Sequence, residues 1–178
     1  MGRNVRIIPK SSVRRVNLLM ILVLLGTQNN DFTRLLKEVQ KNIDNGMIQE
    51  EVIVQAGSTK FESKDMKMFS LIPTDELLKL QEQARIIITH GGVGSIISSI
   101  KMGKKVIAIP RLAKYGEHVN DHQIQIVESF ASNGLIKGVF NIEELGKTLE
   151  KIEEFSPTVF KSNTENMIKI IENFIDNN

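Results

Sequence analysis

Four short runs of apolar, often β-branched residues recur along the chain, separated by segments with helical spacing. The runs occupy residues 18–25, 51–56, 86–89 and 106–109. Strands that are covered on both faces read as nearly continuous apolar runs, so each run is predicted to be a buried strand. The alternation of strands and helices predicts an α/β fold, a Rossmann-like parallel sheet with helices on both faces.

Two helices are predicted between the strands. The first follows Asp31, whose side chain suits an N-cap. Its apolar stripe comprises Phe32, Leu35, Leu36, Val39 and Ile43. The second follows Thr74 at the N-cap, with Asp75 and Glu76 placed favourably for the helix dipole in its first turn.

Further helices are predicted towards the carboxyl end of the sequence. One runs over residues 120–133 and stops at Gly134, a residue suited to a helix C-terminus. Its inward stripe is predicted to comprise Ile124, Val127 and Ala131. Two more cover residues 142–155 and 158–175 and are separated by a Ser-Pro step.

Length and composition narrow the chemistry. The 178 residues, 41% of them hydrophobic, suit one domain with a substantial core. The chain contains no cysteine, which excludes disulfides, thiolate metal sites and cysteine nucleophiles. A reducing cytoplasmic compartment is compatible with this composition.

Charge is concentrated in the first 19 residues, which contain five basic residues and no acid. We interpret residues 1–19 as a flexible basic leader and residues 20–178 as the folded domain; contact of the leader with anionic lipid or a partner is the alternative. The rest of the chain has no basic stripe interleaved with aromatics, so nucleic acid is not expected as a partner. The run at 18–25 lacks a following small-residue cleavage site and is too short to span a bilayer, which favours a buried strand.

A first glycine turn, Gly26-Thr27, directly follows the first strand. Open α/β sheets bind ligands at the carboxyl ends of their strands, so both residues are candidate binding residues. An ordinary tight turn is the alternative. The Gly-x-Gly-x-x-Gly pattern is absent here, which argues against a dinucleotide-binding domain.

A second turn, Thr-His-Gly-Gly-Val-Gly-Ser at residues 89–95, lies between a predicted strand and a predicted helix. Glycines let the backbone approach a ligand closely, and the N–H groups of a helix start can hold a phosphate. His90 would offer a nitrogen donor to the same diphosphate. The candidate phosphate-binding residues are His90, Gly91, Gly92, Gly94 and Ser95.

A third segment, residues 110–123, is dense in polar groups just after a predicted strand. Amide and carboxylate side chains suit the recognition of sugar hydroxyls. The candidates are Arg111, Asn120, Asp121, His122 and Gln123. The alternative makes Asn120 or Asp121 a helix cap and Arg111 a solvated charge. The His and Asp residues here lack a recognised metal-ligand spacing, so no metal is predicted.

These motifs, together with Gly-Lys-Lys through Pro-Arg at residues 103–111, resemble the carboxyl-terminal domain of family 28 glycosyltransferases. The resemblance covers residues 20–174 and implies one half of a GT-B fold. It is strongest to short bacterial capsule and exopolysaccharide transferases. Those enzymes in turn resemble the cytosolic catalytic subunit of the two-part GlcNAc transferase that makes dolichol-linked chitobiose.

The resemblance implies roles for individual residues. The glycine turn with His90 would hold the diphosphate of a UDP-sugar, beside Gly26 and Thr27, and residues 120–123 would lie near the ribose and the sugar. The nucleobase would pack near Ile72, Pro73 and Thr74. Many relatives carry a ribose-binding glutamate where this chain has Ser98, so Gln123 is expected to take a larger part in ribose recognition.

The implied reaction transfers a hexose or N-acetylhexosamine (Gal, Glc or GlcNAc) from the UDP-sugar to a lipid-linked saccharide, with inversion and without metal or other cofactor. A membrane-associated partner subunit is expected to supply the acceptor half and to place the chain at the cytoplasmic membrane face; a homodimer could cover the same surface. Glu117 and His118 are local candidates for the base, beside a group from the partner. The alternatives are a non-catalytic nucleotide-sugar-binding subunit and an enzyme like UDP-GlcNAc epimerases.

Overall fold

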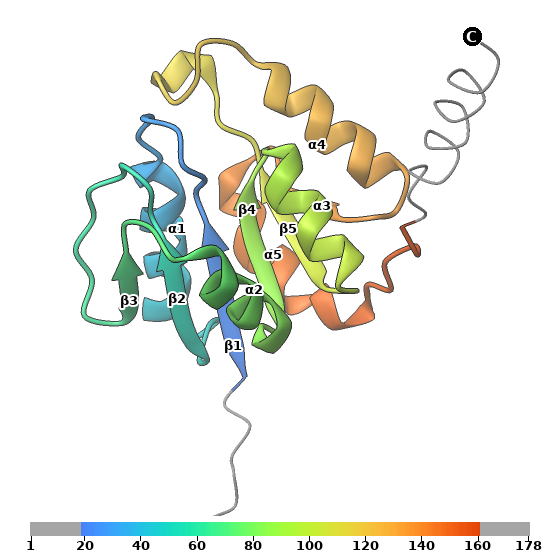
Figure 1. The fold of residues 1–178 in the computed structure, drawn as a ribbon, viewed down its shortest axis with the longest axis horizontal. Helices are drawn as coiled ribbons and strands as arrows, with labels where there is room; N and C mark the ends of the chain where they lie inside the picture. The colour runs from blue at the N-terminus through green and yellow to red at the C-terminus, as the bar shows by residue number, and fades with distance from the viewer. Residues whose placement is uncertain (1–18, 161–178) are drawn as a thin grey trace, which may run out of the picture.

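The four apolar runs form the central strands of a six-stranded sheet, which is parallel as predicted (Figure 1). The computed structural model describes residues 19–160. The strand order is β3-β2-β1-β4-β5-β6. The four predicted strands are β1 (Met20–Leu24), β2 (Glu51–Gln55), β4 (Ile86–His90) and β5 (Lys105–Ile109). Strand β4 extends one residue further than predicted and therefore includes His90.

Helices cover both faces of this sheet (Figure 1). Ile21 and Val23 of β1 point into the core formed with α1 (Thr33–Asp44) and α5 (Leu145–Glu150). Leu22 and Leu24 point into the opposite core, beneath α2 (Thr74–Gln83), α3 (Val93–Lys101) and α4 (His122–Ser132). This period-two alternation between two buried faces explains why the runs contain almost no polar residues.

The start of α1 depends on a contact that the local sequence does not reveal. Asp31 accepts a hydrogen bond from the Thr33 N–H at 3.0 Å, but the N-cap position belongs to Phe32. The Phe32 N–H donates to the buried Thr59 hydroxyl, also at 3.0 Å, from the loop after β2. Similarly, α2 begins at Thr74 with Pro73 at the cap, one residue earlier than predicted.

The carboxyl-terminal helices agree with the prediction only in part. Helix α4 ends at Ser132, and Gly134 follows with a φ of +68°, as its predicted stop requires. Only Val127 of the predicted inward stripe is fully buried. The single helix predicted over residues 142–155 is instead three short pieces, the 3-10 helices η2 (Ile142–Glu144) and η3 (Ile152–Glu154) on either side of α5.

Two strands were not predicted, and both lie at the edges of the sheet. Strand β3 (Met66–Phe69) pairs only with β2, and its central residues are exposed or half-buried. Strand β6 (Lys137–Gly138) has two residues. Edge strands lack the two buried faces that produce an apolar run. Residues 1–18 and most of the helix predicted over 158–175 lie outside the described residues; residues 158–160 are not helical.

The centre of the sheet contains a topological switch point between β1 and β4. The chain leaves β1 towards α1 on one face, and leaves β4 towards α3 on the other. The Thr89 hydroxyl ties the carboxyl ends of these strands together by donating to the Leu24 carbonyl at 3.1 Å. In open α/β sheets a crevice opens at this position, where ligands bind.

Candidate functional site

A cleft of about 420 Å³ opens at the switch point and continues between α2 and α3. We call it the switch-point cleft. Residues from both glycine turns, from β2, from both helices and from α4 line it. They are Leu24, Gly26, Thr27, Gln28, Gln55, Leu77, Gln81, His90, Gly92, Gly94, Ser95, Ser98 and Gln123. The structure therefore brings together the two glycine turns that sequence analysis singled out separately.

His90 lies at the head of the cleft in a slot between two glycines. A Cβ atom on Gly26 would lie 2.6 Å from His90 Cε1, and one on Gly92 would overlap its Nε2. Gly26 also has a φ of +77°, which side chains rarely adopt. Both positions thus require glycine because the imidazole fills the space that a side chain would need.

The protonation of His90 follows from its contacts. Its Nδ1 lies 3.2 Å from the Leu24 carbonyl oxygen, which can only accept, so Nδ1 carries the proton. Burial lowers the pKa of His90 to about 4, partly opposed by this hydrogen bond and reinforced by the charge of Arg111. Near pH 7 the ring is neutral, and its Nε2 presents a lone pair. Nε2 can donate to an anion only after it gains a proton.

The amino terminus of α3 forms one side of the cleft. Gly92 occupies its N-cap, no side chain caps the helix, and no acidic residue lies in its first turn. Gly94 and Ser95, both in the first turn, line the cleft. The backbone N–H groups of a first helical turn have no partner within the helix, and the helix dipole favours negative charge there. This geometry suits a phosphate group.

Glutamines supply much of the remaining polar surface. Gln55 accepts from the Ile72 N–H at 3.1 Å, and Gln123 accepts from the Arg111 N–H at 3.0 Å. Each carbonyl oxygen thus anchors a backbone segment, which leaves the side-chain NH₂ to donate. No Lys, Arg, Asp or Glu is among the described residues that line the cleft, so His90 is the one described lining residue with an ionisable side chain.

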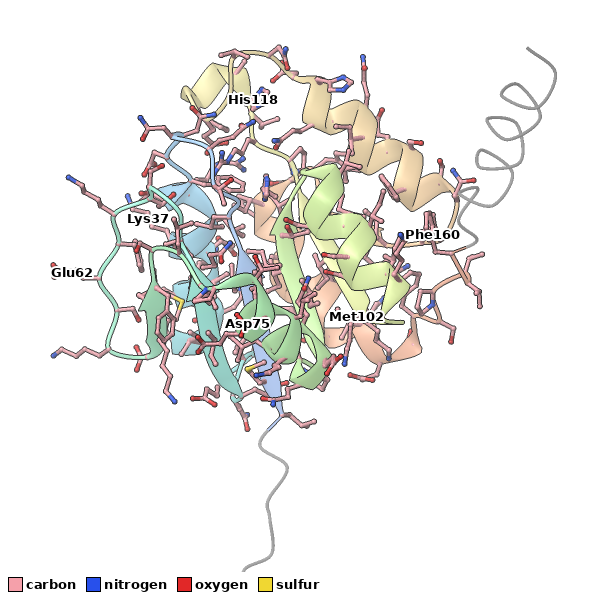
Figure 2. The ribbon with its side chains drawn as sticks, viewed as in Figure 1. Lys37, Glu62, Asp75, Met102, His118 and Phe160 are labelled. Carbon is pink, nitrogen blue, oxygen red and sulfur yellow. The ribbon has the colours of Figure 1, made fainter. Side chains whose placement is uncertain are left out.

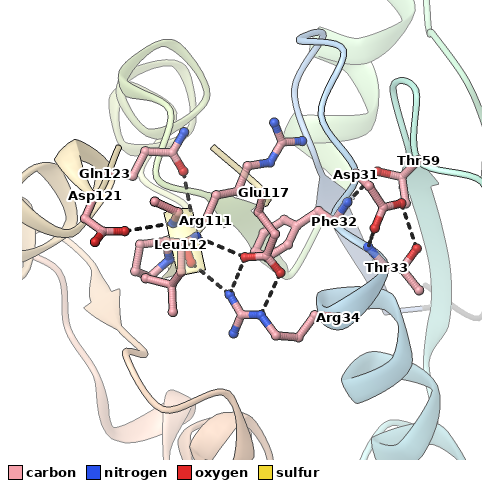
Figure 3. A network of polar contacts seen from close by, with 12 residues as sticks. Asp31, Phe32, Thr33, Arg34, Thr59, Arg111, Leu112, Glu117, Asp121 and Gln123 are labelled. Atoms are coloured by element: carbon pink, nitrogen blue, oxygen red, sulfur yellow. Dashed lines mark hydrogen bonds and ion pairs between the residues drawn. The ribbon is translucent and has the colours of Figure 1, made fainter. Parts of the chain in front are cut away.

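A network of charged groups lies beside the cleft, and Figure 3 shows how it joins α1 to the loop after β5. The Glu117 carboxylate accepts from Arg34 Nε at 2.7 Å, from Arg34 Nη2 at 2.8 Å and from the Leu112 N–H at 3.0 Å. Arg34 also donates to the Pro110 carbonyl at 3.1 Å. We call these four residues the Glu117 network. Because the carboxylate is buried and already bonded three times, its geometry favours a structural role over that of a base.

Arg111 is buried beneath the first glycine turn, with 1% of its surface exposed, and does not line the cleft. Its Nη2 donates to the Leu25 carbonyl at 2.7 Å, and its guanidinium lies 5.5 Å from the centre of the Phe32 ring. Burial lowers the pKa of Arg111, whereas the charges of Glu117 and Asp31 raise it. Arg111, predicted as a sugar-binding residue with a solvated loop charge as the alternative, is instead a buried cation that holds the backbone just before Gly26.

Of the other candidates of the third segment, Asn120 and Asp121 lie on the exposed loop before α4 and His122 is the exposed first residue of that helix, all outside the residues that line the cleft. Asn120 accepts from the His122 N–H at 3.1 Å, and Asp121 accepts from the Ala113 N–H at 2.8 Å. His118 is half-buried on the same loop, with Nδ1 3.0 Å from the Asn120 carbonyl (Figure 2). Gln123 is the one predicted binding residue of this segment that lines the cleft.

The predicted nucleobase segment also lies outside the lining. Ile72 is buried and is fixed by Gln55, while Pro73 and Thr74 are exposed at the start of α2. Gly91 lies behind the cleft, where a Cβ atom would come within 2.8 Å of the Gln123 Cβ. Its role is to let α4 approach the second glycine turn.

Sequence reasoning missed five residues that line the cleft and one side chain of the network. They are Leu24, Gln28, Gln55, Leu77 and Gln81 in the cleft and Arg34 in the network. Gln81 could have been noticed in the sequence. It falls on the inward side of the predicted helix after Thr74, where the neighbouring inward positions are leucines. A polar residue at such a position needs a hydrogen-bond partner.

Among residues 19–160, no group of three or more His, Cys, Asp or Glu side chains gathers closely enough to hold a metal ion. No helix of that part of the chain combines the length and apolar character that crossing a bilayer requires. The expectation of a reaction without metal stays a prediction.

Residues 20–177 match the family model described as the glycosyltransferase family 28 C-terminal domain. No curated protein sequence matches the chain. The matched range includes every described strand and helix.

Solved structures with a similar fold include glycosyltransferases and a UDP-GlcNAc 2-epimerase. The glycosyltransferase of kitacinnamycin is 20% identical with a TM-score of 0.58, over 88% of this chain and 39% of that one. MurG of Acinetobacter baumannii is 14% identical with a TM-score of 0.52, over 78% and 43%. ALG13 is 16% identical with a TM-score of 0.50, over 81% and 89%. The fold is thus one half of a GT-B fold, and the chain spans less than half the length of the first two proteins.

Proposed function

The chain belongs to the glycosyltransferase family 28 C-terminal domains, and from this premise we propose that its switch-point cleft binds a UDP-sugar for transfer of a hexose or N-acetylhexosamine. The acceptor would be a lipid-linked saccharide of capsule or exopolysaccharide synthesis, and the anomeric carbon would be inverted. UDP is the leaving group of this reaction, so groups that stabilise its negative charge would lower the barrier.

The observation that carries the proposal is the convergence of three features at one point. The start of α3, which no described side chain caps, the slot around His90 and the amide of Gln123 all meet in a cleft that no carboxylate of residues 19–160 lines. Backbone N–H groups and side-chain amides fixed in place would bond the two phosphates without a metal ion. His90 would complete this set as an imidazolium, with the diphosphate supplying the negative charge that favours its protonation.

We propose further that a second, membrane-associated subunit provides the acceptor half and the catalytic base. Two supports are the resemblance to short transferases that work beside a separate acceptor-binding subunit, and the structural engagement of Glu117 described above. The complex would then work at the cytoplasmic face of the membrane. His118 stays a local candidate for the base.

The test is calorimetric titration of the purified chain with UDP, UDP-Gal, UDP-Glc and UDP-GlcNAc. We expect UDP and at least one UDP-sugar to bind, and His90→Ala to weaken UDP binding by about tenfold or more, the loss of one charge-assisted hydrogen bond. His122→Ala is the matched control, because it removes an exposed histidine outside the cleft.

Equal binding by wild type and His90→Ala would contradict the phosphate role of this cleft. Absence of binding to all four ligands, with the candidate partner subunit present, would contradict the proposal as a whole. Binding without sugar transfer in the complex would favour the non-catalytic alternative, and epimerised UDP-sugar formed without an acceptor would favour the epimerase-like one.

A further inference from the structure

Helix α2 contains one buried residue, the polar Gln81, and its neighbours on the helix are more exposed to solvent. Gln81 has 2% of its surface exposed and is the buried residue of α2, whereas Leu78 is 40% exposed. Burying an amide costs free energy unless its groups are hydrogen-bonded. The partners of Gln81 therefore determine what this side chain does.

The orientation of the Gln81 amide is set by two serines of α3. Ser98 Oγ donates to the Ser95 carbonyl at 3.2 Å, and Ser99 Oγ donates to the same carbonyl at 2.7 Å. With their protons engaged, both hydroxyl oxygens can only accept, so they must face the side-chain nitrogen of Gln81. Gln81 Nε2 indeed donates to Ser98 at 2.9 Å and to Ser99 at 3.1 Å.

The opposite end of this amide is an acceptor without a protein donor in residues 19–160. Both protons of Gln81 Nε2 are used by the two serines, and no donor in that range bonds Oε1. Gln81 and Ser98 both line the switch-point cleft. The Ser98 oxygen retains a second lone pair. The wall between α2 and α3 thus presents two neighbouring oxygens that can accept but not donate.

Such a pair fits a ligand with two adjacent hydroxyl donors. Ser98 lies three residues beyond Ser95 along α3, about 4.5 Å from the proposed phosphate site. In a nucleoside diphosphate the ribose is attached directly to the first phosphate, so its 2′- and 3′-hydroxyls would reach this wall. Neutral acceptors are suitable because, in the part of the chain that the structure describes, no carboxylate lines the cleft to compete for those protons.

We propose that Gln81 is the specificity-determining residue for the ribose diol, held in position by Ser98 and Ser99. This inference rests on the proposed function, because it assumes a nucleoside diphosphate in the cleft. What it adds to the proposed site is Gln81, a buried residue of α2 that none of the glycine-rich or polar motifs contains.

Titrations with UDP, 2′,3′-dideoxy-UDP and inorganic pyrophosphate test the assignment. In the wild type we expect UDP to bind at least about tenfold more tightly than the dideoxy analogue, since the analogue leaves buried acceptors unpaired. In Gln81→Met, which keeps the length of the side chain but not its acceptor, we expect UDP to weaken to the level of the dideoxy analogue. Affinity for the dideoxy analogue and for pyrophosphate should stay unchanged.

Two further variants guard against a purely structural explanation. Gln83→Met replaces an exposed glutamine on the same helix and should keep the preference for UDP. Ser98→Ala favours the helix and so should fold, but it removes one of the groups that hold the amide. We expect it to reduce the ratio of UDP to dideoxy-UDP affinity by about threefold or more, the loss of one neutral hydrogen bond.

A preference for UDP that persists in both Gln81→Met and Ser98→Ala, or a wild type that binds both nucleotides equally, would overturn the assignment while leaving UDP binding intact. A wild type that binds neither nucleotide would overturn the proposed function together with it. A parallel loss of UDP, dideoxy-UDP and pyrophosphate binding in Gln81→Met would assign the residue to folding of the cleft instead.

Discussion

The switch-point cleft and the Glu117 network lie at the same edge of the sheet but use opposite kinds of side chain. The cleft is lined by glycines, serines and glutamines, with His90 neutral near pH 7. The network holds a bidentate ion pair between Arg34 and Glu117 that is largely withdrawn from solvent. In this protein the charged side chains thus stabilise the structure around the cleft, whereas the polar groups of the cleft surface are neutral donors and acceptors.

The largest expected effect tests the supporting role. Glu117→Gln removes the charge opposite Arg34 and should lower the free energy of unfolding by roughly 3 to 5 kcal/mol, as expected for a broken buried ion pair. Urea unfolding monitored by circular dichroism measures this. The exposed Glu143 provides the control, since Glu143→Gln should change stability by less than about 0.5 kcal/mol. If Glu117→Gln leaves stability unchanged but abolishes sugar transfer, Glu117 takes part in the reaction. The contrast between a binding cleft and a purely structural Glu117 network would then be wrong.

A prediction of intermediate size tests whether His90 is uncharged in the folded protein near pH 7. The folded-state pKa of His90, about 4, lies below its ordinary value of 6.5, so the unfolded chain binds this proton first. His90 therefore leaves stability unaffected above pH 6.5 and reduces it as the pH falls from 6.5 towards 4. Between pH 7 and pH 5 we expect a loss of about 2 kcal/mol from this residue.

His90→Asn checks this value, because its side-chain NH₂ can still donate to the Leu24 carbonyl but does not titrate. The difference between wild type and variant in urea unfolding should shrink by about 2 kcal/mol from pH 7 to pH 5. An identical pH dependence in the two proteins would show that the pKa of His90 is the same in the folded and the unfolded chain, and would contradict the lowered value.

The smallest effect concerns the exposed loop. Asp121→Ala removes the acceptor of the Ala113 N–H and should cost about 1 kcal/mol of stability, because water can replace part of that bond. UDP affinity in the isolated chain should stay within about twofold of the wild type, since Asp121 does not line the cleft. A tenfold loss measured by calorimetry would extend the binding surface onto this loop.

The central fold could be predicted from sequence because its strands are buried on both faces. The same reasoning failed for β3, where the exposed Lys67 interrupts the apolar run between the buried Met66 and the half-buried Met68. It also failed for residues 142–155, where Gly146 lies against Asn42 of α1 and the segment breaks into short turns. Edge strands and segments packed on a distant helix are determined by tertiary contacts that local periodicity does not contain.

The candidate site divides along the same line. Gly26, His90 and Gly92 could be predicted because a glycine turn after a strand has a local pattern and a known place in the fold. Glu117 could not be interpreted from its neighbours, since its partner Arg34 is 83 positions away. Gln81 also gave little signal, because its meaning depends on two serine hydroxyls 17 and 18 residues further along.

The pairing of β1 with β4 has a consequence for the time course of folding. The strands meet through Thr89 and Leu24, 65 positions apart in the chain, so closing this contact requires a long loop and should be slow compared with formation of a single helix. Neither half of the chain alone contains both glycine turns. Acquisition of nucleotide binding during refolding would therefore report the docking of the two halves, and its rate would measure that step directly.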